Sequence, residues 1–310
     1  MIIQTGMRTD IPAFYSDWFA NRLRAGFVLV RNPYNPSAIT KYRLDPSVVD
    51  MIGFCTKNPQ PMLKYMDLLK AYGQYWFVTI TPYGKDMEPY TPSFPSAIDT
   101  FRKLSRIVGI TSIAWRYDPI ILTPYWTVEK HIDAFTVMCK ALAGYTHTSV
   151  ISFVDLYEKV KQNAPDIKPV SFSDQMILTK ALVEIGKKYG MVVKPCGESQ
   201  KLETVGADCS GCMTVRTFET AIGQNLACPP NPYNRKECAC YLTGDIGAYN
   251  TCGHLCRYCY ANAEADAVRQ AIKRHDPQSP LLIGQVGAGD RITEAKQISW
   301  IDPQMRMDLW

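Results

Sequence analysis

The stretch SIAWRYDPIILTPYWTVEKHIDAFTVMCKALAGYTHTSVISFVD, residues 112–155, holds two short runs of β-branched and aromatic residues on either side of a helix-like segment. Within that segment apolar side chains recur at the spacing that places them on one helix face: Val128, Ile132, Phe135, Cys139 and Leu142. Gly144 then supplies a left-handed stop. A strand, a helix and a second strand in this order predict a parallel βαβ unit.

The same alternation extends over most of residues 27–193. Further strand-like runs are FVLVRNP (27–33), MIGFCTKNP (51–59), YWFVTITPYG (75–84) and MVVKPCGE (191–198). A helix is predicted over 173–190, with Ser173 as its N-cap and Gly190 after its end. Because the strand-like runs are apolar nearly throughout, we expect a parallel sheet that is covered by helices.

A doubly wound sheet and a closed barrel both fit this pattern. Polar residues recur where the strands end, namely Arg31, Asn32, Lys57, Asn58, Arg116, Asp118, Asp155 and Lys194. In a barrel such side chains surround one mouth, where chemistry is done. We therefore expect an α/β fold with a parallel (β/α) barrel of TIM-like or partial type. Residues 1–195 would form the barrel body, 196–245 a cysteine-rich metal-binding appendage, and 246–310 a further cysteine loop with closing elements.

The composition is that of an ordinary globular protein. The 310 residues are 46% hydrophobic and 20% charged, with a formal net charge of +5. No basic segment followed by an apolar run opens the sequence, and no apolar run is long enough to cross a bilayer. We expect a cytoplasmic protein without a membrane partner. Nucleic acid remains a possible partner, but the mild charge and the lack of a Lys/Arg run do not indicate one.

Cysteine is the most informative residue type. The chain has eleven cysteines, an odd number that argues against a disulfide framework in a protein without a signal peptide. Nine of them follow residue 195: Cys196, Cys209, Cys212, Cys228, Cys238, Cys240, Cys252, Cys256 and Cys259. Metal or cluster chemistry is the better interpretation of such a cysteine-rich end.

The segment CGHLCRYCYAN, residues 252–262, packs three cysteines into eight residues. Three thiolates around a four-iron cluster leave one iron open for a substrate or cofactor. Zinc is instead usually held by two pairs of ligands from separate turns. An iron–sulfur cluster at Cys252, Cys256 and Cys259 is therefore favoured over zinc, a purely electron-carrying cluster or free thiols. His254 inside this segment is expected to be solvated or to hydrogen-bond near the cluster.

This C-x3-C-x2-C pattern, with Tyr258 before its last cysteine, resembles the signature of the radical S-adenosylmethionine (SAM) enzymes. The resemblance implies that a reduced [4Fe–4S] cluster cleaves SAM to a 5′-deoxyadenosyl radical, which abstracts hydrogen from a substrate. It also implies that the Tyr258 ring lies against the adenine. A flavodoxin or ferredoxin would serve as the reducing partner.

A longer set of motifs resembles a bacterial family called domain of unknown function 1848, whose members carry this triad toward the C-terminus. The motifs are RTDIPAFYSDWF, KNPQPMLKYMD, ITPYGKDMEP, WRYDPII, ISFVDLYEKV, CAC, DIGAYNTCGHLCRYCYAN, HDPQSPLLIG and DRITEAK, spread over residues 8–298. The arrangement resembles a permuted barrel whose cluster-binding strand comes last, with spore photoproduct lyase as a distant relative.

The family resemblance also implies a second metal site. Its pattern matches Cys196, Cys212, Cys238 and Cys240, and four thiolates suit either zinc or a second iron–sulfur cluster. The pair formed by Cys209 and Cys212 is an alternative source of ligands.

Several residues receive provisional roles around the barrel mouth, to which Arg8 and Asp10 are also assigned. Arg116 or Asn58 would bind the SAM nucleotide, and Asp118 and Lys57 would contact the substrate. Cys55, where the family usually has tryptophan, would either donate hydrogen to a product radical, as the likeness to spore photoproduct lyase implies, or be a small buried hydrophobe.

Function classes other than a radical SAM enzyme remain open. The chain could be an iron–sulfur electron carrier or a zinc-stabilised binding module. Among enzymes, the likeness to spore photoproduct lyase favours repair or modification of nucleic acid.

Overall fold

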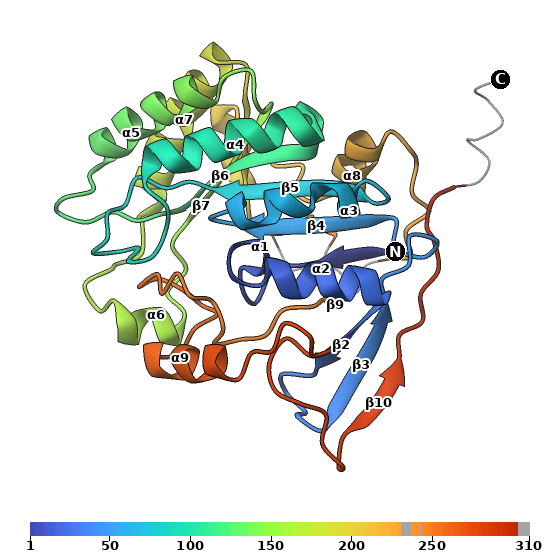
Figure 1. The fold of residues 1–310 in the computed structure, drawn as a ribbon. Helices are drawn as coiled ribbons and strands as arrows, with labels where there is room; N and C mark the ends of the chain where they lie inside the picture. Colours follow the sequence, from blue (N-terminus) through green and yellow to red (C-terminus); the bar gives the residue numbers. More distant parts are fainter. Residues whose placement is uncertain (231–236, 242–243, 303–310) are drawn as a thin grey trace, which may run out of the picture.

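A seven-stranded parallel sheet forms the centre of the computed structural model, which describes residues 1–230, 237–241 and 244–302 (Figure 1). Its strands are β1 (Ile2–Gln4), β4 (Met51–Thr56), β5 (Gly73–Thr79), β6 (Ile113–Ile120), β7 (Thr148–Phe153), β8 (Val192–Pro195) and β9 (Gly244–Asp245). Their order is β8-β7-β6-β5-β4-β1-β9. Every neighbouring pair is parallel, so the carboxyl ends of the strands meet at one edge.

The predicted alternation is confirmed for β4 to β8 but is wrong for the first run. Phe27–Arg31 forms β2, which pairs antiparallel with β3 (Ala38–Arg43) in a separate three-stranded sheet completed by β10 (Arg291–Glu294). The cause is the turn between them, where the Asn32 side chain accepts hydrogen bonds from the backbone N–H groups of Tyr34 and Asn35. Arg31 therefore pairs with Asp290 on this small sheet, away from the expected mouth.

A closed barrel is not established. Within the described ranges no pairing joins β8 to β9, the two outermost strands of the sheet. The observed fold is thus an α/β fold with a seven-stranded parallel sheet. β9 is its last strand in chain order and lies beside the short β1. The division of the chain at residues 195 and 245 stays a prediction.

Helices cover one face of the sheet, as expected for parallel strands. The helices α4 (Phe94–Val108), α5 (Val128–Leu142) and α7 (Phe172–Lys188) lie along this face (Figure 1). On it, Trp115 stacks on Phe135 of α5 with ring centres 4.7 Å apart. The predicted helices are confirmed, but α7 begins earlier than expected, and Ser171 rather than Ser173 caps it by accepting from the N–H of Asp174.

The remaining helices lie at the strand ends and edges. They are α1 (Ile11–Phe14), α2 (Ser16–Ala25), α3 (Met66–Leu69), α6 (Glu158–Asn163), α8 (Val215–Ile222) and α9 (Ala265–Lys273), with 3₁₀ turns at Gln60–Tyr65, Ile110–Ser112 and Gln200–Val205. In the described part of the chain no helix is both long and apolar enough to cross a membrane.

The opposite face of the sheet has its own core. Side chains alternate along each strand, so Ile52, Phe54 and Trp76 face the helices, whereas Cys55 and Phe77 face the other way. The second core joins this inner face to Cys212, Met213, Phe218 and Cys240 of the cysteine-rich segment. The sheet and the cysteine-rich segment therefore pack together.

Candidate metal and cofactor site

A cavity of ≈ 310 Å³ lies at the carboxyl ends of β4 to β8. It collects most of the residues that the sequence singles out: Cys55, Lys57, Arg116, Asp118, Asp155, Tyr258, Cys196, Cys212, Cys238, Cys240, Cys252, Cys256 and Cys259. Both groups of cysteines thus line one space. The strand residues that line the cavity are placed by the alternation of side chains along each strand. Cys55 and Phe77, for example, face the cavity side by side because they are paired in register on neighbouring strands.

The loop that carries Cys252, Cys256 and Cys259 has no regular secondary structure over those residues. Leu255 adopts a left-handed conformation with φ 52°, which turns the chain between the first two cysteines. The backbone N–H of Cys259 donates to the carbonyl of Cys256 at 3.1 Å. Asn262 closes the loop, since its Nδ2 donates to the carbonyl of Cys252 at 2.8 Å.

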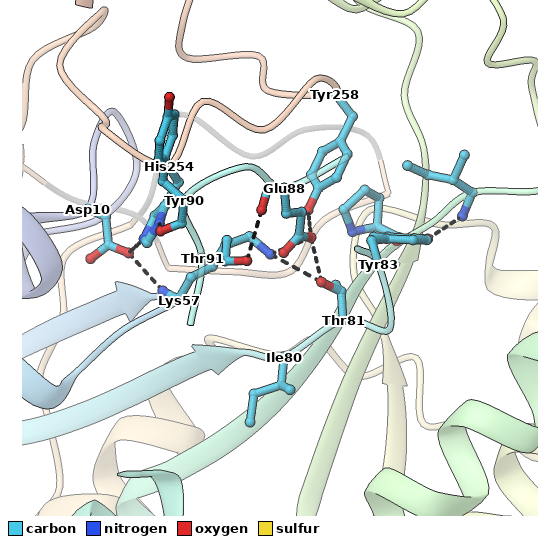
Figure 2. A network of polar contacts seen from close by, with 12 residues as sticks. Asp10, Lys57, Ile80, Thr81, Tyr83, Glu88, Tyr90, Thr91, His254 and Tyr258 are labelled. Atoms are coloured by element: carbon cyan, nitrogen blue, oxygen red, sulfur yellow. Dashed lines mark hydrogen bonds and ion pairs between the residues drawn. The ribbon is translucent and has the colours of Figure 1, made fainter. Parts of the chain in front are cut away.

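His254 ties this loop to the start of α1 (Figure 2). It is buried, so the expectation of a solvated side chain is wrong. Its Nε2 lies 2.9 Å from Oδ2 of Asp10, and its Nδ1 lies 3.2 Å from the carbonyl of Tyr90. The same Asp10 oxygen accepts the backbone N–H of Lys57 at 2.7 Å. One carboxylate therefore positions both the loop and the end of β4.

A second buried carboxylate, Glu88, organises the opposite side of the loop (Figure 2). Its Oε1 is 3.0 Å from Nζ of Lys57 and accepts hydrogen bonds from the hydroxyls of Thr81 and Tyr258. Burial opposes ionisation of Glu88, but Lys57 and the two hydroxyls outweigh it and lower its pKa. Burial likewise disfavours the Lys57 ammonium, yet Glu88 and Cys256 raise its pKa. Both groups are charged at neutral pH.

Sequence reasoning missed Glu88. It lies in the irregular segment after β5, inside the motif ITPYGKDMEP, where no strand or helix period predicts which side chain turns inward. That motif was the signal available in the sequence.

Arg116 and Asp118 form an ion pair on β6, and Ser152 of β7 donates its hydroxyl to the same carboxylate. Burial opposes the charge of Arg116, but Asp118 and the thiols of Cys196 and Cys55 raise its pKa. Its Nε is buried and has no hydrogen-bond partner. The cavity therefore contains a permanent cation with one donor unused.

Besides Arg31, Asn32 and Lys194, two further predicted mouth residues lie outside the cavity lining. The side-chain oxygen of Asn58 accepts the N–H of Gln60 at 3.2 Å and so supports its own turn. Arg8 lies 3.4 Å from Asp245 of β9 and donates to the carbonyl of Gly247. Arg8 therefore connects the chain before α1 to the end of β9.

Three of the four predicted cysteines come together beside β8. The sulfurs of Cys196, Cys212 and Cys240 all lie within 4.8 Å of one another, and those of Cys212 and Cys240 are 3.2 Å apart. Hydrogen bonds with Cys196, Cys212 and Cys238, together with burial, raise the pKa of Cys240. Cys238 therefore adjoins Cys240, although its sulfur is not one of the three that all lie within 4.8 Å of one another. This buried group can bind a metal ion or a cluster.

The comparisons with known proteins now identify the family. The profile described as "Domain of unknown function (DUF1848)" matches residues 2–261. The chain belongs to the DUF1848 family. No curated protein matches it. Among solved structures it is similar to the FimX EAL domain of Xanthomonas citri in complex with c-diGMP, at 12% identity over 64% of this chain and 90% of that one. The TM-score is 0.21, so this likeness establishes no shared fold.

In this DUF1848 chain none of the described cysteines around the cavity forms a disulfide. Burial raises the pKa of Cys252, Cys256 and Cys259, and it raises that of Cys55 to about 12. Without metal these thiols stay protonated at neutral pH. Metal binding would therefore release protons from the cavity.

Proposed function

We propose that this DUF1848 protein is a radical SAM enzyme, with a [4Fe–4S] cluster at Cys252, Cys256 and Cys259 and SAM in the ≈ 310 Å³ cavity. The observation that carries the proposal is the meeting of these three thiols with two cationic side chains, Lys57 and Arg116, around one cavity. When bound, the cluster and SAM would supply a 5′-deoxyadenosyl radical that abstracts hydrogen from a substrate.

The residues present fit such a cluster. In a cubane each thiolate binds its own iron, so the sulfurs stand farther apart than sulfurs around one ion. The sulfurs of Cys252, Cys256 and Cys259 are not all within 4.8 Å of one another, unlike those of Cys196, Cys212 and Cys240. Three ligands from one loop also leave the fourth position to a cofactor.

The cationic groups suit the carboxylate and the nucleotide of SAM. Arg116 keeps its charge and has a buried Nε without a partner, so it is our proposed contact for the carboxylate. Asn58 is the weaker candidate because its amide oxygen already supports a turn. The ring of Tyr258, whose hydroxyl Glu88 holds, would lie against the adenine.

The substrate would lie between β6 and β4. Asp118 and Lys57 are the polar groups proposed to contact it. Cys55 keeps its S–H at neutral pH because its pKa is about 12, and an S–H rather than a thiolate can give a hydrogen atom to a product radical. The thiyl radical left on Cys55 would return to the thiol with one electron and one proton, the electron coming from the reducing partner, a flavodoxin or ferredoxin.

Anaerobic reconstitution with iron and sulfide tests this proposal. After addition of dithionite and SAM, we expect 5′-deoxyadenosine from the wild-type chain and none from Cys252→Ala, Cys256→Ala or Cys259→Ala. Cys228→Ala is the matched control, because Cys228 lies near the N-terminal amine and outside the cavity lining. Retained 5′-deoxyadenosine in a triad variant contradicts the assignment.

A reconstituted, brown chain that never cleaves SAM would instead support an electron carrier, and a colourless chain that holds only zinc would support a binding module. Salt-dependent binding to DNA or RNA would point to a nucleic-acid substrate, because phosphate contacts weaken steeply with salt.

A further inference from the structure

The four thiols come from segments that adjoin, in sequence, the two outermost strands of the parallel sheet. Cys196 directly follows β8, which ends at Pro195, and Cys240 comes four residues before β9, which begins at Gly244. These strands are the two ends of the sheet order and do not pair in the described residues. Cys212 comes from the loop before α8 and meets both.

The spacing of three of these sulfurs is that of ligands around one ion. The four thiols also line the ≈ 310 Å³ cavity, so the distance between the sulfurs, rather than the free volume, distinguishes one ion from a cluster. Around a tetrahedral zinc, Zn–S bonds of ~2.3 Å put the sulfurs about 3.8 Å apart. The observed close sulfur group agrees with that spacing.

The three segments are held in place by contacts other than the thiols. Lys194 of β8 pairs with Asp208 at 2.8 Å and donates to the carbonyl of Gly211 at 3.2 Å, which holds the Cys212 loop against the strand. The N–H of Tyr241 donates to the carbonyl of Met213 at 2.7 Å. The chain therefore positions the ligands before any metal binds.

Gly211 allows the Cys212 loop to lie close to the Cys238–Cys240 segment. Its φ is +103°, and a Cβ there would lie 2.9 Å from Cβ of Ala239, between Cys238 and Cys240. A side chain at this position would separate the loop from the C-x-C pair. Gly211 thus allows Cys212 and Cys240 to lie close together.

Cys238 rather than Cys209 is the proposed fourth ligand. Cys238 lines the cavity together with Cys196, Cys212 and Cys240, whereas Cys209 does not. Cys238 also contacts the thiol of Cys240, while the neighbours of Cys209 are the carboxylates of Glu203 and Asp208.

We infer that Cys196, Cys212, Cys238 and Cys240 bind a single zinc ion that joins three segments lining the cavity: the one after β8, the loop before α8 and the one before β9. Four thiolates around a divalent ion leave a net charge of −2, which the neighbouring guanidinium of Arg116 partly offsets. Zinc is favoured over ferrous iron by its greater affinity for such a site. This site does not depend on the proposed radical chemistry.

Metal analysis of the variant Cys252→Ala/Cys256→Ala/Cys259→Ala tests the inference without the loop cluster. We expect one zinc per chain and no iron or sulfide, and, after exchange into cobalt, the thiolate-to-cobalt charge-transfer and visible d–d absorption of a tetrahedral four-sulfur site. In this background, Cys212→Ser or Cys238→Ser should lose the zinc. Cys209→Ser and the distant Cys228→Ser should keep it.

Iron with sulfide in the triple variant would overturn the single-ion site, and zinc retained in Cys238→Ser would overturn the fourth ligand. Hydrogen exchange tests the role at the sheet edges, where removal of zinc should speed exchange in β8 and β9 and leave β2 and β3 unchanged. Equal exchange with and without zinc contradicts that role. Failure of the proposed function alone would appear differently, as a zinc-loaded wild type that does not cleave SAM.

Discussion

Nε2 of His254 lies 2.9 Å from Oδ2 of Asp10, the carboxylate that also caps α1. The pair joins the middle of the cysteine loop to the first helix of the chain, across 244 residues of sequence. Because Asp10 also accepts the N–H of Lys57 at 2.7 Å, its two oxygens fix three separate backbone segments.

Asp10→Ala should therefore destabilise the fold markedly. It removes a helix cap and leaves two buried donors unpaired, for which we expect a loss of about 2–4 kcal/mol in the free energy of unfolding. Urea denaturation measures the loss. The control is Asp99→Ala, since Asp99 forms an exposed pair with Lys103 within α4, and there the change should stay within about 0.5 kcal/mol. Equal losses in the two variants contradict the anchoring role.

Gly6→Ala should also be costly, because the backbone at Gly6 touches β4. A Cβ on Gly6 would lie 2.2 Å from the carbonyl oxygen of Cys55 and 2.6 Å from its Cβ. We expect about 1–3 kcal/mol of destabilisation and a smaller cavity, since both residues line it. Gly289→Ala is the matched control, as nothing lies within 4 Å of a Cβ there. Thermal unfolding of both variants is the measurement. A lower melting temperature in Gly6→Ala alone indicates the close contact with Cys55, whereas an equal decrease in both variants indicates a general effect of replacing glycine.

Glu88→Gln should break the buried pair with Lys57. At pH 7 the unpaired ammonium is expected to cost about 3–5 kcal/mol, and adding Lys57→Met should restore part of the loss.

The pH dependence of this loss has a definite sign. Burial alone would raise the pKa of Glu88, but Lys57 and two hydroxyls hold it below its ordinary value of 4.5. The ionised carboxylate thus contributes its full stability above that value and loses it as the pH falls through the lower folded-state pKa. Urea denaturation between about pH 3 and pH 7 should therefore show the gap between wild type and Glu88→Gln narrowing only on the acid side. A gap that is independent of pH contradicts the ionised pair.

Arg116→Ala should weaken the binding of SAM, whereas Arg31→Ala should not. Loss of a charge-assisted contact at Arg116 is expected to weaken binding about 10- to 100-fold. Arg31 pairs with Asp290 on the small sheet, so its removal should leave the affinity unchanged. Anaerobic titration calorimetry of the reconstituted chains measures both, and an equal loss in both variants would exclude a specific role for Arg116.

The sequence predicted β4 to β7 because these strands are apolar and have six to eight residues. β8 has only four residues and was recognised because it follows the helical pattern of α7. β1 and β9 were not predicted, because they have three and two residues, too few to show the alternation of a strand. Phe27–Arg31 was misassigned, since an apolar strand does not reveal whether its neighbour is parallel or antiparallel. The polar run of β3 and the Asn- and Pro-rich turn before it were the available signs of a hairpin.

The candidate site was predictable where residue type alone limits the chemistry, as for the cysteines. It was less so for residues placed by tertiary contacts. Glu88 comes from an irregular loop, and the burial of His254 depends on Asp10, which lies far away in sequence. Asn58 follows Lys57 at the end of β4 and was therefore given a similar role, but its side chain accepts a local hydrogen bond from Gln60 instead.

The 3.2 Å approach of the Cys212 and Cys240 sulfurs also affects how the protein must be handled. Two thiols this close need only give up two electrons and two protons to oxygen to become a covalent bridge. A chain stripped of its metal in air would then be locked in a form that no longer accepts an ion. The protein should therefore be purified under strictly reducing conditions, so that Cys212 and Cys240 remain able to bind a metal ion.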